Sequence, residues 1–471
     1  MPAKLLKNTI IYALGDIIPR ALSFITFPIL TSFLSLSDYG IVNYVNTIIF
    51  LLTTIGFLCL NTYYLVFYYR VGNEEEQKKL LGNLSIFVIG LNILLSIFCL
   101  GIGSIFPKVF SAKISFFPYI AIGIITNFFN ILAILPSALY RVQENPLPLT
   151  MLNILRGFLS TGLVILLVVK YKFTALGVLY STLAVSFLFG LIFLVITFNN
   201  MTWHIDRIQL KHALAFSLPL LPGSLAYYFL TMADRLFIER YLDLNQLGTY
   251  TTASTLAMIL NILSYGAYKA FEPYFFKIYK TPEFKKIFIY IQNVYILAIL
   301  FGAMGLSIFA KEFFAIFASE PYQGVWYYVP MVEAGVVFSS IRLLYATIIT
   351  AKEKTKLNTI ITIIGGILGI LLNILLLPHL GIVAACLASG FALGLILILS
   401  AYFSKIEISF IRPGFAVIVS AIIIYFNVYV LNIDYIWLTV TIKTLLLLSS
   451  ILVIMRILGL NLLKLHYDRY L

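Results

Sequence analysis

The sequence predicts an all-α polytopic membrane protein with about 14 transmembrane helices, organised as two parallel six-helix repeats followed by two C-terminal helices. Three observations support this prediction. Of the 471 residues, 61% are hydrophobic and 11% are charged, with a mean hydropathy of +1.01, whereas soluble chains carry about 25% charged residues. Apolar stretches long enough to cross a bilayer recur along the whole chain. A pattern in the first half also returns about 208 residues later.

The predicted spans follow from the distribution of charge. Stretches without Asp, Glu, Lys or Arg cover 41–69, 80–107, 114–140, 173–203, 244–268, 287–310, 357–404 and 413–433. Other apolar segments with one or a few charges cover 8–34, 147–169, 212–241, 326–350 and 435–455. Pro378-His379-Leu380-Gly381 interrupts the longest stretch, so we expect 357–404 to form two helices joined by a tight turn.

The basic residues predict the orientation in the membrane. An even number of spans places both termini on one side. Most of the 32 Lys and Arg residues lie at the N-terminus, in alternate loops and in the C-terminal tail, with dense groups at 70–79, 269–286 and 352–356. By the positive-inside rule both termini are cytoplasmic. Lys4 and Lys7 precede an apolar run that is too long for a signal peptide, so we expect a retained first helix.

Several function classes are disfavoured. The net charge of +13 is explained by cytoplasmic loops and does not indicate nucleic-acid binding. The three cysteines lie far apart in apolar runs, and the four histidines lack ligand spacing, so we expect no disulfide, metal or other cofactor. The loops are too short for a soluble catalytic domain and contain no phosphate-binding loop. We therefore expect a transporter rather than an enzyme.

An internal repeat organises the chain. Leu34-Ser-Leu-Ser-Asp-Tyr-Gly40 corresponds to Leu242-Asp-Leu-Asn-Gln-Leu-Gly248, and residues 174–192 align with 378–396. Because each copy holds an even number of helices, both copies enter the membrane in the same direction, a plan found in alternating-access transporters. The predicted domains are an N-lobe at 1–205 with helices 1–6, a C-lobe at 206–404 with helices 7–12, and helices 13–14 with a cytoplasmic tail at 405–471.

The first helix of each copy carries residues that interrupt helices. These are Gly15 and Pro19 in the first copy, and Pro219, Pro222 and Gly223 in the second. Glycine and proline at corresponding places in two halves point to hinges or to a binding site.

Several arginines lie within predicted spans. An ionisable side chain at membrane depth costs at least about 2.5–3.5 kcal/mol, so it should face protein or water. We expect Arg20, Arg156 and Arg342 to line a cationic cavity that binds substrate, because the arginine fork makes bidentate bonds to phosphate. Asp16 stands four residues before Arg20 and could neutralise it instead.

Four further charges are candidates for a gate or for ion coupling. They are Asp16, Asp234, Arg235 and Glu333. Asp234 and Arg235 could equally form a structural pair at the membrane interface.

Short motifs along nearly the whole chain resemble the bacterial polysaccharide (O-antigen/capsule) flippase family of the multidrug/oligosaccharidyl-lipid/polysaccharide exporter superfamily. They are Asn8-Thr-Ile-Ile-Tyr12, Pro28-Ile-Leu-Thr31, Ser37-Asp-Tyr-Gly40, Ala138-Leu-Tyr-Arg-Val-Gln-Glu144, Phe216-Ser-Leu-Pro-Leu-Leu-Pro222, Asp234-Arg235 and Leu247-Gly-Thr-Tyr250.

This resemblance implies two six-helix lobes in a V and two additional helices. It implies a flippase in the bacterial inner (cytoplasmic) membrane that moves undecaprenyl-pyrophosphate-linked oligosaccharide to the outer leaflet for O-antigen, capsule or exopolysaccharide synthesis. The implied partners are the lipid-linked oligosaccharide, membrane lipid, a glycan polymerase and chain-length proteins, with no nucleic acid.

Other functions stay open on the sequence. An ion-coupled multidrug antiporter needs an acidic membrane site, for which Glu333 is the best candidate. A peptidoglycan-precursor lipid flippase would belong to the same superfamily. A membrane glycan polymerase or ligase is less favoured because it is expected to have a large periplasmic loop. A purely structural scaffold would not need interrupted, repeated helices.

Overall fold

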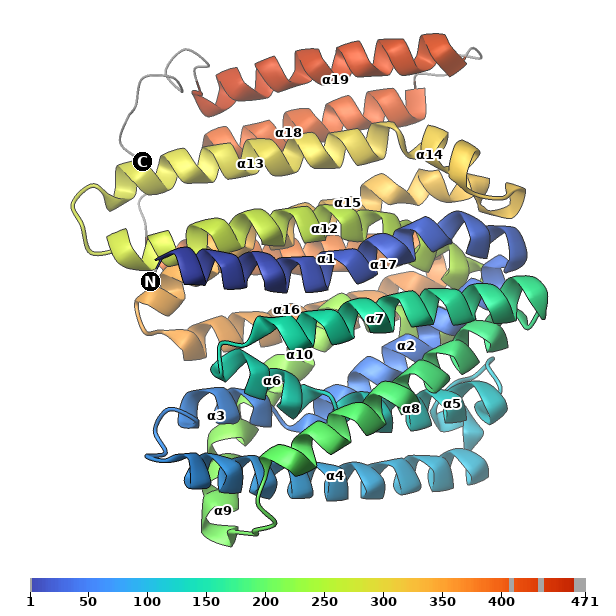
Figure 1. Ribbon diagram of the computed structural model, residues 1–471. Helices are drawn as coiled ribbons and strands as arrows, with labels where there is room; N and C mark the ends of the chain where they lie inside the picture. The colour runs from blue at the N-terminus through green and yellow to red at the C-terminus, as the bar shows by residue number, and fades with distance from the viewer. Residues whose placement is uncertain (1, 406–410, 431–435, 461–471) are drawn as a thin grey trace. The chain divides into compact units, whose positions relative to one another are not determined.

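The computed structural model describes residues 2–405, 411–430 and 436–460, and every regular element within them is helical (Figure 1). The prediction of an all-α membrane protein is confirmed. The elements of the first half are α1 (Pro2–Phe33), α2 (Leu36–Phe57), α3 (Leu60–Phe67), α4 (Glu74–Ile105), η1 (Pro107–Val109), η2 (Phe116–Ile120), α5 (Ala121–Ile131), α6 (Ile134–Val142), α7 (Pro146–Ile165), η3 (Leu166–Lys170) and α8 (Thr174–Asn200).

The second half continues with a similar series of long and short helices. They are α9 (Arg207–Ser217), η4 (Leu218–Leu220), α10 (Leu221–Thr231), α11 (Asp234–Tyr241), α12 (Leu244–Ile278), α13 (Phe284–Ile308), α14 (Ala310–Phe317), η5 (Glu320–Tyr328), α15 (Val329–Ala351), α16 (Thr355–Leu380), α17 (Ile382–Ser404), α18 (Ile411–Tyr425), η6 (Phe426–Val430) and α19 (Ile436–Leu458).

Each of the predicted spans corresponds to one or more of these helices. In the described residues, 12 helical stretches are long and apolar enough to cross a membrane. The remaining two predicted spans are α1, whose apolar part is Ile17–Phe33, and α12, whose first half is rich in Thr, Ser and Asn. The predicted turn in 357–404 is present, because α16 ends at Leu380 and Gly381 adopts a φ of +58° that glycine tolerates best.

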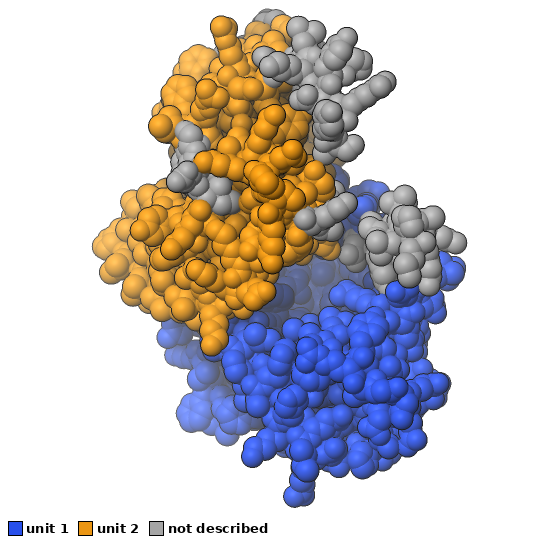
Figure 2. Space-filling model, turned by 90° about the vertical axis from the view of Figure 1, so that its left-hand side faces the viewer, with its two compact units in different colours: residues 1–228, 235–248 blue, residues 229–234, 249–471 orange. Residues whose placement is uncertain are grey.

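The described chain divides into two compact units (Figure 2). Unit 1 holds residues 1–228 and 235–248, and unit 2 holds residues 229–234 and 249–471. Helix α12 therefore begins in unit 1 and continues in unit 2. The lobe boundary expected from the repeat, between residues 205 and 206, stays a prediction.

The predicted span 41–69 consists of two helices, because the backbone turns between α2 and α3. Leu58 and Cys59 both adopt left-handed conformations, with φ of 50° and 59°. The break leaves the Gly56 carbonyl without its helical partner, and Asn92 Nδ2 on α4 donates a hydrogen bond to that oxygen at 2.8 Å. A buried amide on a neighbouring helix thus replaces the lost backbone bond, as hydrocarbon surroundings require.

Gly15 and Pro19 were expected to interrupt the first helix, but α1 is continuous from Pro2 to Phe33 with Pro19 inside it. Close packing against α7 explains its continuity. A Cβ placed on Gly157 would lie 3.1 Å from Pro19 Cβ, and one placed on Gly15 would lie 3.0 Å from Thr150 Oγ1. Small residues let the two helices approach, and neighbouring helices commonly stabilise proline in a membrane helix.

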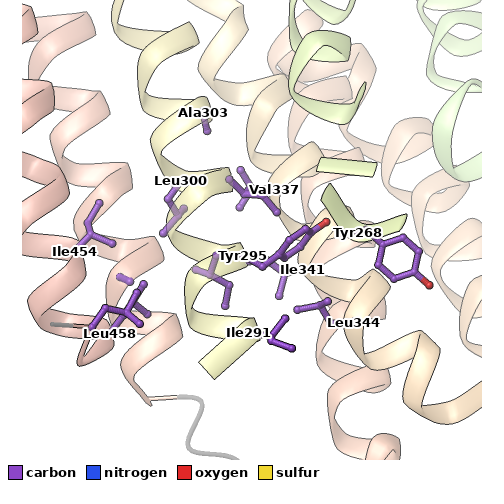
Figure 3. Close-up of a cluster of buried hydrophobic side chains, with 14 of the residues drawn as sticks. Tyr268, Ile291, Tyr295, Leu300, Ala303, Val337, Ile341, Leu344, Ile454 and Leu458 are labelled. Atoms are coloured by element: carbon purple, nitrogen blue, oxygen red, sulfur yellow. The ribbon is translucent and has the colours of Figure 1, made fainter. Parts of the chain in front are cut away.

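A large buried cluster lies in unit 2 and centres on α13 (Figure 3). Tyr295 and Leu300 of α13 pack with Ile341 of α15 and with Ile454 of α19. Helix α19, which follows the repeat, therefore belongs to the same core as α13 and α15.

Candidate functional site

Arg156 lies on α7 in unit 1, where residues of two other helices hold its guanidinium. Its Nη2 donates hydrogen bonds to Asn130 Oδ1 on α5 at 2.5 Å and to Ser186 Oγ on α8 at 3.3 Å. The side chain is half-buried. Both acceptors are neutral, so among the described residues these bonds orient the arginine without cancelling its charge.

Arg342 has a comparable environment in unit 2. It lies on α15 and donates from Nη2 to Thr362 Oγ1 on α16 at 2.8 Å and from Nε to Ser400 Oγ on α17 at 3.3 Å. It is also half-buried. Each arginine is thus oriented by neutral oxygens from the two helices that pack against its own. For Arg156, the five donors of the guanidinium exceed its two bonds, so further donors can serve a ligand.

The third predicted arginine, Arg20, lies on α1 and its side chain is exposed. Asp16, its suggested partner, has a side chain outside the described residues. The role of both in a cavity or a pair stays a prediction.

Asp234 is the centre of a buried polar cluster in unit 2. Its side chain is 5% exposed. Oδ1 accepts from Asn373 Nδ2 on α16 at 2.8 Å, and Oδ2 accepts from Tyr250 Oη on α12 at 2.7 Å and from Ser389 Oγ on α17. Asp234 stands directly after the break between α10 and α11, so the break brings a carboxylate into contact with three helices.

Arg235 is buried in unit 1, and the same short helix anchors a loop there. Glu239 Oε1 accepts from Ser111 Oγ and from the Lys113 backbone N–H, both at 2.6 Å. Glu239 is 1% exposed. The Glu239 carboxylate therefore stabilises the loop between η1 and η2.

Glu333 lies near the start of α15 in unit 2 and is 1% exposed. Its Oε2 accepts a hydrogen bond from Ser307 Oγ on α13. The structure therefore places the two acidic candidates of unit 2, Asp234 and Glu333, in separate environments.

The predicted hinge in the second copy coincides with a change of helix type. The 3₁₀ turn η4 contains Pro219 and separates α9 from α10, which begins one residue before Pro222 and two before Gly223. Proline lacks the N–H that would continue the helix, which explains the change. Whether Gly15, Pro19 and these residues act as hinges during transport stays a prediction.

The sequence did not identify the polar partners of these charges. These partners are uncharged polar residues within the helices: Asn130, Ser186, Thr362, Ser400, Tyr250, Asn373 and Ser389. Membrane helices often carry such residues, so only the packing distinguishes those that bind a charge. The described residues contain no group of three or more His, Cys, Asp and Glu side chains that could hold a metal ion.

Known proteins resemble this chain in sequence and in fold. An uncharacterized membrane protein of Haemophilus influenzae is 22% identical over 336 residues, which cover 69% of this chain and 78% of that protein. The lipid II flippase MurJ in an inward closed conformation superposes with a TM-score of 0.74 at 16% identity, covering 95% of this chain and 99% of MurJ.

A second solved structure shares the fold. It is an inward-facing multidrug resistance MATE family transporter of the MOP superfamily, with a TM-score of 0.68 at 14% identity, covering 84% of this chain and 97% of that chain. A family profile described as polysaccharide biosynthesis protein matches residues 5–279, more than half of the chain. The chain has the same fold as these two solved structures. From the match of its sequence, it belongs to the polysaccharide biosynthesis protein family.

Proposed function

We propose that this protein is a flippase that moves an undecaprenyl-pyrophosphate-linked oligosaccharide from the cytoplasmic to the outer leaflet of the bacterial cytoplasmic membrane by alternating access. The family match supports a role in polysaccharide synthesis. A sugar–pyrophosphate head cannot cross hydrocarbon unaided, because burying charge and hydroxyl groups without partners costs several kcal/mol for each group. A protein cavity can hold the head while the prenyl chain stays in lipid.

The observation that carries this proposal is the environment of Arg156. Its guanidinium is oriented by Asn130 and Ser186, and both are neutral acceptors. A positive charge at membrane depth without a bonded carboxylate is costly, and such residues commonly mark a substrate pathway. A pyrophosphate supplies the oxygens that the remaining N–H groups can bind. Arg342 in unit 2 also donates to neutral oxygens, those of Thr362 and Ser400, and Arg342 and Arg20 are further candidates for binding an anionic group.

The transport cycle can draw on the membrane potential. Moving about two negative charges outward, with the inside negative, gains about 4–5 kcal/mol per 100 mV. Asp234 is our candidate for ion coupling, because a buried carboxylate with amide and hydroxyl neighbours can exchange a proton or a small cation. Asp16 is a secondary candidate for the same role, and Arg235 is a candidate for a gate.

The orientation with both termini in the cytoplasm has support from the charge distribution at one end of unit 2. Lys352 follows α15, and its Nζ donates to the Ser404 carbonyl at the end of α17. Lys354 and Lys405 lie close enough to influence its charge. A group of lysines at one end of the helices is typical of the cytoplasmic face.

A reconstitution experiment tests the proposal. Proteoliposomes would carry fluorescent undecaprenyl-pyrophosphate oligosaccharide in the inner leaflet, and an external quencher would report its arrival outside. We expect Arg156→Ala and Arg342→Ala to reduce the initial rate by about tenfold or more, because each removes charge-assisted hydrogen bonds. The exposed Arg207 provides the control, since Arg207→Ala should move lipid at the wild-type rate.

The same vesicles separate the alternatives. Movement of a lipid II analogue but not of the oligosaccharide lipid would favour a peptidoglycan-precursor flippase, the activity named for the similar structure. Exchange of an organic cation for protons with no lipid movement would favour an antiporter of the multidrug type. Lipid movement that survives both arginine substitutions would contradict the cationic site while keeping the flippase.

A further inference from the structure

Unit 2 contains a cavity of about 640 Å³ between α13, η5, α15 and the α18–η6 segment. Aromatic side chains form much of its wall: Trp326, Tyr327, Tyr425 and Tyr429. Tyr429 Oη donates to the Tyr327 carbonyl at 2.7 Å and so links two sides of the wall. Figure 3 shows Leu300, Ala303 and Val337, which line the apolar side on α13 and α15. A volume of this size is typical of a small-molecule site.

Glu333 is the carboxylate among the residues that line this cavity. Glu333 is 1% exposed, and only its Oε2 has a partner, Ser307 Oγ. Its Oε1 has no hydrogen-bond partner in the described part of the chain. A buried carboxylate oxygen without a donor is strongly unfavourable, so either a proton or a cation should occupy it.

The other charged side chains at this end of unit 2 do not supply that cation. Lys443 Nζ lies 2.7 Å from Glu312 Oε1 and 2.9 Å from the Ile308 carbonyl. Lys311 Nζ lies over the Trp326 ring, 5.8 Å from its centroid. Glu320 is exposed on η5. Within the described residues, Glu333 therefore has a hydroxyl partner and no cationic one.

The cavity is open to a ligand, because Tyr327, Ala334, Ala421 and Tyr425 at its wall are all exposed. A hydrated metal ion would find one carboxylate in a space much larger than itself. An ammonium group on an apolar body fits better, since the charge can pair with Glu333 while the body fills the aromatic wall.

We propose that this cavity, defined by Glu333, Trp326, Tyr327, Tyr425 and Tyr429, is a binding site for an amphiphilic ammonium compound. The compound places its ammonium on the cavity side of the Glu333 carboxylate and its apolar part against the aromatic rings. Two sources share this chemistry: the headgroup of an aminophospholipid and a free lipophilic amine. The site lies entirely in unit 2 and is independent of the proposed arginine site, so either proposal can fail alone.

Binding can be measured on the purified full-length protein in maltoside detergent with dansylcadaverine, a primary amine on an aromatic body. Energy transfer from tryptophan to the dansyl group reports occupancy. Dansylamide, which lacks the ammonium, is the matched probe. We expect saturable binding of dansylcadaverine only, and Glu333→Gln should raise its Kd by about tenfold or more. The exposed carboxylate in Glu320→Gln serves as the control and should leave Kd unchanged.

A second variant keeps the test independent of Glu333. Ala421 is exposed at the cavity wall, so Ala421→Phe fills the space without touching the carboxylate and should also weaken binding. Competition by phosphatidylethanolamine but not by phosphatidylglycerol would support the site and identify the lipid headgroup as the source. Binding without such competition would support the site for free amines.

Two results would overturn the proposal. One is equal affinity of wild type and Glu333→Gln for dansylcadaverine. The other is no saturable binding by the wild type at any pH between about 6 and 9, a range over which a lipophilic amine stays charged.

Discussion

Gly40 and Gly248, which occupy equivalent positions in the internal repeat, pack against each other in unit 1. A Cβ placed on Gly40 would lie 2.9 Å from Gly248 N and 2.7 Å from the Leu244 carbonyl oxygen. A Cβ placed on Gly248 would overlap the Leu36 carbonyl oxygen. The contacts are reciprocal, because Leu36 and Leu244 are themselves equivalent in the repeat. The repeated motif therefore marks a place where the first turns of α2 and α12 meet backbone to backbone.

This packing predicts a specific sensitivity at Gly248. The substitution Gly248→Ala should lower the free energy of unfolding by about 1–3 kcal/mol, because backbone atoms cannot move aside as a flexible side chain can. Gly266 lies on the same helix, and a Cβ there would meet nothing within 4 Å. Thermal unfolding in detergent should therefore show a lower Tm for Gly248→Ala and no such loss for Gly266→Ala. Equal Tm values for both variants would contradict the close approach.

The ion pair between Lys443 and Glu312 should behave as a buried pair. Its Nζ–Oε1 distance is 2.7 Å and both side chains are largely buried. Removing one partner leaves an uncompensated charge, so Lys443→Met should cost about 3–5 kcal/mol. The double variant Lys443→Met/Glu312→Leu should recover most of that loss, because no lone charge remains. Chemical denaturation of the single and double variants measures the difference, and a double variant as unstable as the single one would argue against the pair.

We predict that a substitution of Asp234 uncouples lipid movement from an ion gradient without stopping lipid movement. Asp234→Asn keeps the size of the side chain, and the amide can still exchange hydrogen bonds with Tyr250, Asn373 and Ser389. The asparagine side chain cannot carry the negative charge that binds a proton or a cation. We expect vesicles with this variant to lose the acceleration that an ion gradient gives to the wild type, while movement without a gradient continues.

Asp243 is the matched control for that experiment. It is exposed and caps α12, since its Oδ1 accepts from the Gln246 N–H at 2.7 Å. Asparagine caps helices as well as aspartate, so Asp243→Asn should retain full coupling. Normal gradient acceleration in Asp234→Asn would remove this residue from the coupling mechanism.

The amine of Lys352, which lies outside the membrane spans, should react in a pH-dependent way. Burial, together with the nearby charges of Lys354 and Lys405, lowers the pKa of Lys352 below its usual range. Between the lowered folded-state pKa and the unfolded value, the folded chain binds fewer protons. The contribution of Lys352 to the free energy of unfolding therefore rises with pH in that window.

Acetylation with acetic anhydride at increasing pH, followed by mass spectrometry, reads the protonation of Lys352 directly. The variant Lys354→Gln removes one repulsive charge, so the pH at which Lys352 becomes reactive should move upward. The variant Lys405→Gln should act in the same direction. A reactivity profile that neither variant changes would exclude the electrostatic contribution.

The sequence by itself was sufficient to predict the helical membrane fold, since apolar stretches of about 20 residues have few alternatives in a bilayer. It also predicted the turn at Gly381, because proline and glycine interrupt the apolar run there. The repeat identified Gly40 and Gly248 as equivalent. Local composition and spacing contain all of this information.

The tertiary structure decided which residues act together. The break between α2 and α3 depends on Asn92 from α4, and the continuity of α1 through Pro19 depends on Gly157 from α7. The neutral partners of Arg156 and the open oxygen of Glu333 likewise come from packing. A polar side chain in an apolar helix has the same appearance in sequence whether it meets a charge or its own backbone, and only the neighbouring helix distinguishes the two.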